Sequence, residues 1–169
     1  ELMGHTVVVH SGPDKVSCGT IGPAVTTHAV SLGTYPGYDG PTVVTGTVEV
    51  FQTDSLTLGL AYNMMGLDAS TSAGLHIHSG MSCNAADLVG GHFWTPSESP
   101  DPWTTNYSAD STGKAEGRIS VQSGYTLADV YGHAVVVHDA VGKIACGIIS
   151  GDDSTSTPTA TPTSSTPSP

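Results

Sequence analysis

The stretch GLHIHSG, residues 74–80, is the segment from which the fold and the chemistry of this chain are best argued. In an extended strand successive side chains point to opposite faces, so His76 and His78 share one face, about 7 Å apart. Leu75 and Ile77 then share the other face. One face of this strand can hold a metal ion while the other joins a hydrophobic core. A single His-x-His pair is equally typical of two half-buried strand histidines, so the rest of the sequence has to decide.

Length and composition favour one all-β domain with an appendage. The chain has 169 residues, only 11% of them charged, and is rich in Gly, Thr, Ser and Val, which favour strands and turns over helices. It shows no long stretch with helical periodicity and no apolar run of about 20 residues that would span a bilayer. The first ten residues lack the pattern of a signal peptide, so we expect a mature protein or an excerpt.

The net charge of the chain argues against a nucleic-acid partner. The 15 acidic and 4 basic residues give a formal net charge of −11 at pH 7. A surface of this sign repels phosphate backbones, so we predict no nucleic-acid partner.

Eight candidate strands are separated by turn signals, a pattern typical of an antiparallel sandwich or barrel. They cover residues 28–33, 42–52, 55–63, the histidine strand, 103–109, 115–121, 133–138 and 143–149. Residues 79–102 form the longest irregular stretch and carry Cys83 and His92. A loop of this length in a compact domain is usually functional or tied down.

One segment of the sequence occurs twice. Residues 3–22 recur 128 positions later as residues 131–150, with ten of the twenty aligned positions identical. Each copy has the form of a strand, a tight turn and a strand, and the body between the copies is not duplicated. We therefore expect residues 1–22 to be the terminal hairpin of a preceding repeat in a tandem array, followed by a linker over residues 23–27.

The C-terminal segment, residues 151–169, is rich in Ser, Thr and Pro and offers no apolar core. We expect an extended spacer that is O-glycosylated if the protein is secreted. Asn106 begins an Asn-Tyr-Ser acceptor for N-glycosylation. Three cysteines allow at most one intramolecular disulfide, which an extracellular setting would preserve. Together these features favour an extracellular location, secreted or at the cell surface.

Four histidines complete a pattern that resembles a known family. His76, His78, His92 and His138 would provide four neutral imidazoles, which suit copper(II) and, less specifically, zinc. The order of GLHIHSG, a cysteine, GGHF, GHAVVVH and KIACGIIS resembles copper/zinc superoxide dismutase over residues 28–150. The resemblance implies an eight-stranded antiparallel Greek-key β-barrel, these four histidines as copper ligands, and a disulfide between Cys83 and Cys146.

Two departures from the family bear on zinc and on subtype. No histidine lies between His92 and His133, where the resemblance calls for two further zinc ligands, so we expect zinc to be absent. Only residues 139–142 separate His138 from Lys143, where the family has a long charged loop. Both losses resemble the secreted copper-only superoxide dismutases, and the duplicated hairpin resembles their tandem-repeat relatives.

The resemblance also assigns catalytic roles. Lys143 takes the place of the family's active-site arginine, so it is either an anion guide or a solvated lysine beside a turn. His92 would release the copper and gain a proton on reduction. Without zinc another group must orient its second nitrogen, and Asp101 and Asp110 are both candidates.

Two functions from different classes remain. We expect a copper-only superoxide dismutase-like unit that converts superoxide to oxygen and hydrogen peroxide outside the cell. The alternative is a structural subunit of an extracellular filament or cell-wall assembly. His10 and Cys18, in the first hairpin, either find their partners in a preceding repeat or dock on a neighbouring chain by strand addition.

Overall fold

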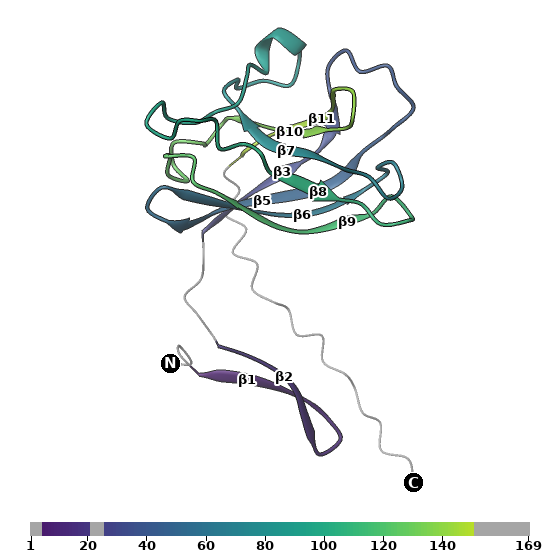
Figure 1. The fold of residues 1–169 in the computed structure, drawn as a ribbon, viewed down its shortest axis with the longest axis vertical. Coiled ribbons are helices and arrows are strands. Elements are labelled where there is room, and N and C mark those ends of the chain that lie inside the picture. The colour runs from purple at the N-terminus through teal and green to yellow at the C-terminus, as the bar shows by residue number, and fades with distance from the viewer. Residues whose placement is uncertain (1–4, 21–25, 151–169) are drawn as a thin grey trace.

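The computed structural model describes residues 5–20 and 26–150, and the regular secondary structure of these residues is almost entirely β-strand (Figure 1). The one helical element in this part of the chain is the 3₁₀ helix η1 (Ala86–Leu88). The strands are β1 (Thr6–Ser11), β2 (Asp14–Thr20), β3 (Thr27–Ser31), β4 (Gly33–Thr34), β5 (Thr45–Asp54), β6 (Thr57–Met65), β7 (Ser72–His78), β8 (Asn106–Ser108), β9 (Ala115–Val121), β10 (Ala134–His138) and β11 (Lys143–Ile148). The expected spacer over residues 151–169 and most of the expected linker lie outside the described residues. None of the described helical residues form a segment long and apolar enough to cross a membrane.

The strands of the body form two antiparallel sheets that pack face to face (Figure 1). One sheet has the order β4-β11-β10-β7-β8, and the other has the order β3-β5-β6-β9. At the two sides of the body β8 lies near β9 and β11 lies near β3. The predicted all-β antiparallel fold is confirmed. Within residues 26–150 the hydrogen-bonded ladders form two sheets instead of one closed ladder, and β1–β2 forms a third, two-stranded sheet.

The hydrophobic core lies between the sheets because each strand alternates its faces. Val48 and Val50 of β5 point inward and are fully buried, while Glu49 between them is exposed, as the period of two residues in a strand requires. Leu75 and Ile77 of β7 meet them from the other sheet and have no exposed area. Burial of one such side chain contributes about 1.5–3 kcal/mol, so this alternation sets which face of β7 is left for chemistry.

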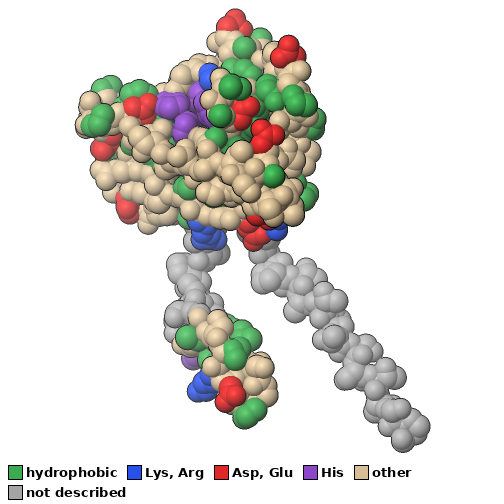
Figure 2. Space-filling model, turned by 45° about the vertical axis from the view of Figure 1, so that its right-hand side comes forward, with side chains coloured by type: hydrophobic (Ala, Val, Ile, Leu, Met, Phe, Trp, Pro, Cys, Tyr) green, Lys and Arg blue, Asp and Glu red, His purple; other side chains and the backbone are tan. Residues whose placement is uncertain are grey.

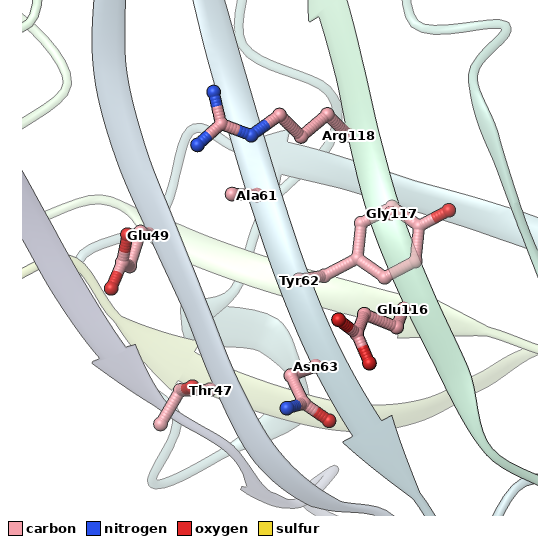
Figure 3. A pocket seen from close by; sticks show the side chains of 8 residues that line it. All are labelled: Thr47, Glu49, Ala61, Tyr62, Asn63, Glu116, Gly117 and Arg118. Atoms are coloured by element: carbon pink, nitrogen blue, oxygen red, sulfur yellow. The ribbon is translucent and has the colours of Figure 1, made fainter. Parts of the chain in front are cut away.

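The outward face of the second sheet is polar and lies on the opposite side of the core from the histidines. A shallow depression there is shown in Figure 3, where the side chains of Glu49, Asn63, Glu116 and Arg118 stand on neighbouring strands. The guanidinium of Arg118 lies 5.2 Å from the ring centre of Phe51. This face has the character of a solvated sheet surface.

Two expected strands are shorter than the sequence suggests. The strand expected over residues 28–33 is divided, since β3 belongs to one sheet and β4 to the other, with the Leu32 amide donating to the Gly46 carbonyl at the crossing (3.2 Å). The strand expected over residues 103–109 is regular only in β8. The preceding residues instead support the histidines, as described next.

Candidate metal centre

Three segments that are distant in sequence bring the four histidines together. His76 and His78 lie on the outward face of β7, and His138 ends the neighbouring strand β10. The loop after β7 returns to β7 itself. There His92 forms a β-bridge with His78, and the Phe93 amide donates to the Ile77 carbonyl (2.9 Å). One ligand atom from each of the four histidines lies within 4.8 Å of the others. Figure 2 shows the histidine side chains gathered in one place on the surface of the body.

Backbone carbonyls fix the orientation of the two β7 imidazoles. His78 Nδ1 lies 2.9 Å from the Gly90 carbonyl, and His76 Nε2 lies 3.1 Å from the Thr105 carbonyl. A carbonyl can only accept, so each of these nitrogens carries the proton and the other nitrogen of each ring keeps a free lone pair. His76 Nδ1 is buried without a hydrogen-bond partner, and His78 Nε2 lies 3.4 Å from His138 Nε2. These free lone pairs are what a metal ion requires.

Asp101 orients the third imidazole. Its Oδ2 accepts a hydrogen bond from His92 Nδ1 at 2.7 Å, while its Oδ1 accepts from the Trp103 amide at 2.9 Å. The Trp103 indole donates in turn to the Phe93 carbonyl (2.7 Å), next to His92. Asp110, the other candidate, accepts hydrogen bonds within its own turn from the amides of Thr112 and Lys114. Of the two aspartates, Asp101 is therefore the one that holds His92.

Burial keeps the imidazoles of His76, His78 and His138 neutral. Desolvation lowers the pKa of His76 to about 4, with the neighbouring His92 and His138 adding to the effect. Desolvation also lowers the pKa of His78 to about 3 and that of His138 to about 4. Neutral imidazole is the form that binds metals, so at neutral pH protons compete little with a metal ion for these three histidines.

Lys143, at the start of β11, contacts the loop after β7 that carries His92. Its Nζ donates to the Gly90 carbonyl at 3.2 Å and lies 5.5 Å from the ring centre of Tyr35. Its charge is close enough to contribute to the lowered pKa of both His78 and His138. Lys143 is thus held beside the cluster, and its role as an anion guide stays a prediction.

A disulfide ties the loop to the sheet. Cys83 in the loop is bonded to Cys146 on β11, as the resemblance implied, with their Cα atoms 6.0 Å apart. Closing a loop across a separation of 63 residues is worth about 4 kcal/mol in the chain-entropy model. The amide of Gly80 donates to the Val89 carbonyl (2.9 Å), and the Ala134 amide donates to Gly80 (2.9 Å), which closes the loop on itself and onto β10. Asn106 is exposed on β8, and its glycosylation stays a prediction.

Comparison with solved structures identifies the architecture. The structure is similar to that of Cu/Zn superoxide dismutase from Brucella abortus, with a TM-score of 0.55 and 21% sequence identity, over 73% of this chain and 99% of that chain. The fold is that of copper/zinc superoxide dismutase. No family model matches the sequence, and no curated protein matches it. At this identity the likeness to superoxide dismutase concerns the fold, so the chemistry has to be argued from the histidine cluster.

The groups that orient the four histidines could not be predicted from the sequence. The carbonyls of Gly90 and Thr105 belong to the backbone and have no signature in side-chain type. The signal in the sequence is the glycine at position 90. The structure requires a glycine there, because the residue adopts a φ of +72° and a Cβ would lie 2.4 Å from Ser79 Oγ. Tyr35, which donates to the Ala86 carbonyl at 3.3 Å and faces Lys143, was not singled out either.

Proposed function

We propose that residues 28–150 form a copper-only superoxide dismutase-like unit that disproportionates superoxide to oxygen and hydrogen peroxide outside the cell. In this proposal the two sheets correspond to the family's flattened eight-stranded Greek-key barrel, and His76, His78, His92 and His138 are the metal ligands. The observation that carries it is the convergence of four imidazole ligand atoms within 4.8 Å of one another. The disulfide supports an extracellular location, because such bonds persist in oxidising compartments.

Copper is supported by the donor set. Four imidazoles without a thiolate or a carboxylate among the ligand atoms favour copper(II) over harder cations. Zinc is not needed to orient His92, because the carboxylate of Asp101 already accepts from its Nδ1. This contact leaves His92 Nε2 available as a ligand and supports a site that works with copper alone.

The residues of the chain have distinct tasks in the proposed reaction. Bound copper would supply one-electron redox chemistry, oxidising one superoxide to oxygen and reducing a second, which leaves as hydrogen peroxide after gaining two protons. His92 can hold a proton at Nε2 when that nitrogen is not a ligand, and Asp101 keeps the ring in place while this happens. Lys143 supplies positive charge beside the cluster of a chain whose formal net charge is −11.

The test is metal analysis of purified protein together with a superoxide assay. We expect about one copper per chain with activity, and zinc alone would contradict the proposal. Asp101→Asn is expected to lower activity about 10–100-fold, the range typical for loss of a group that orients a metal ligand. Asp110→Asn is the matched control, since its hydrogen bonds stay within its own turn. Equal effects of the two substitutions would exclude the assigned role of Asp101.

A structural subunit of an extracellular filament is the second candidate. The observation that favours it is the hairpin β1–β2, which forms a sheet of its own and exposes several valines. Copper bound at one per chain without dismutase activity would favour this candidate, because a metal can also serve stability alone.

A further inference from the structure

The hairpin β1–β2 has the same pairing register as β10–β11. Val8 is opposite Cys18 as Val136 is opposite Cys146, and the strands of both hairpins are antiparallel. Each hairpin has a register shift at the equivalent position, between Val9 and His10 in one and before His138 in the other. The two hairpins are therefore the same structural element, including its irregularity.

Their surroundings differ completely. Val7, Val9 and Val16 are exposed to 52%, 52% and 58%, whereas the equivalent Val135, Val137 and Ile144 are exposed to 0%, 0% and 1%. In the body these three residues belong to the core between the sheets. The same face of β1–β2 consequently has the composition of a core face without a core against it.

The hairpin also carries the chemical groups of the site. His10 is opposite Lys15 as His138 is opposite Lys143. Cys18 is a free, exposed cysteine, whereas Cys146 is bonded to Cys83. The hairpin β1–β2 thus has a histidine, a lysine and a cysteine at the positions where a superoxide dismutase-like unit has a metal ligand, a positive charge and a disulfide cysteine.

We propose that β1–β2 is the closing hairpin of a second superoxide dismutase-like unit. It inserts between strands equivalent to β7 and β4, gives His10 to that unit's histidine cluster, and bonds Cys18 to the cysteine equivalent to Cys83. The exposed face formed by Val7, Val9 and Val16 would then pack against the hydrophobic core of that second unit. That unit differs from the body described here, because in this body β10 already pairs with β7, β11 pairs with β4, and Cys83 is already bonded.

The chemistry of the partner follows from this placement. It must offer an open sheet whose neighbouring strand carries a His-x-His pair, a loop with a third histidine, and an unpaired cysteine in that loop. Formation of the new disulfide removes two electrons and two protons from the two thiols, taken up by a thiol oxidant of the oxidising compartment. The metal part of this proposal rests on the proposed copper site, whereas the pairing and the disulfide do not.

An extended chain tests the proposal. Residues 23–130 are placed directly before residues 3–169, so that the N-terminal hairpin follows residue 130 in the way that residues 131–150 do. We expect two coppers per chain, two disulfides, no free thiol, and a peptide linking Cys18 to the Cys83 of the added unit. In the matched control residues 23–150 precede residues 23–169, so both units have the hairpin β10–β11.

The outcomes separate the alternatives. His10→Ala in the extended chain should remove one copper and leave both disulfides, and His138→Ala should remove the other copper. The proposal is overturned if the control chain binds two coppers while the extended chain binds only one and its Cys18 still reacts as a free thiol. If neither chain binds copper, the proposed function fails. The disulfide map and the thiol count still decide whether the hairpin closes the added unit.

Discussion

The hairpins β1–β2 and β10–β11 share one sequence pattern but differ in their surroundings, since the first is exposed and the second is packed into the core. Both pair in the same register with the same irregularity, so hairpin geometry is encoded locally in their valines and in the short turn. Only β10–β11 is buried, disulfide-bonded and close to other histidines. Local sequence therefore specifies the shape of the element, while strand β7 and the loop after it turn that shape into a site.

The largest difference between the hairpins should appear on their apolar faces. Val137→Asp places an unpaired charge in the core and should lower the free energy of unfolding of the body by about 4–5 kcal/mol. Val9→Asp, the equivalent change on the exposed face, should alter it by less than about 0.5 kcal/mol. Chemical denaturation of both variants measures this contrast. Similar losses would show that the N-terminal hairpin packs on the body.

The cysteines should separate the hairpins by a smaller amount. Cys146→Ser removes the disulfide and should cost about 2–5 kcal/mol, together with a weaker hold on the loop that carries Gly90 and His92. Cys18→Ser removes a free, exposed thiol and should leave the melting temperature unchanged. Thermal unfolding with and without a reductant provides the measurement, since reduction should abolish the difference between the parent and Cys146→Ser. A reductant without effect on the parent would contradict this assignment.

Acid should distinguish the histidines in the metal-free protein. Burial lowers the pKa of His138 from 6.5 to about 4, so between these values the unfolded chain binds more protons than the folded one. The corresponding stability is complete above about pH 6.5 and is lost as the pH falls towards 4. His138→Gln should therefore flatten the dependence of unfolding free energy on pH in this window, whereas His10→Gln on the exposed hairpin serves as control. Parallel curves for parent and His138→Gln would exclude this account.

The smallest expected effect concerns the two lysines. Lys143→Glu should slow superoxide turnover several-fold and make its rate less sensitive to added salt, because the guiding positive charge is replaced by a negative one. Lys15→Glu makes the same change of net charge at the equivalent position of the other hairpin. Rates measured for both at low and high ionic strength separate a local effect from one of total charge. Identical salt dependence would remove Lys143 from the mechanism.

Much of the fold was accessible from the sequence because alternation is a direct consequence of strand geometry. The opposite faces of β7 and of Val48, Glu49 and Val50 follow from a period of two residues. The convergence of His92 with His78 required the family resemblance, since no local rule brings a loop residue back to a strand.

Loop conformation and backbone acceptors could not be predicted in this way. Asp101 and Asp110 were equivalent candidates, and only the path of residues 101–105 beside His92 distinguishes them. The same path explains why β8 is shorter than expected, because the Trp103 amide donates to Asp101 instead of a neighbouring strand.

The Gly90 carbonyl oxygen connects the position of the Lys143 charge with the orientation of the His78 ring, which protein engineering would aim to change separately. The Gly90 carbonyl accepts from both the His78 imidazole and the Lys143 ammonium. Moving the lysine to strengthen attraction of anions would therefore also disturb the ring that sets ligand geometry. In the proposed dismutase, attraction of the anionic substrate and the geometry of the metal ligands therefore depend on the same carbonyl, and improving one independently would require a new acceptor for the other.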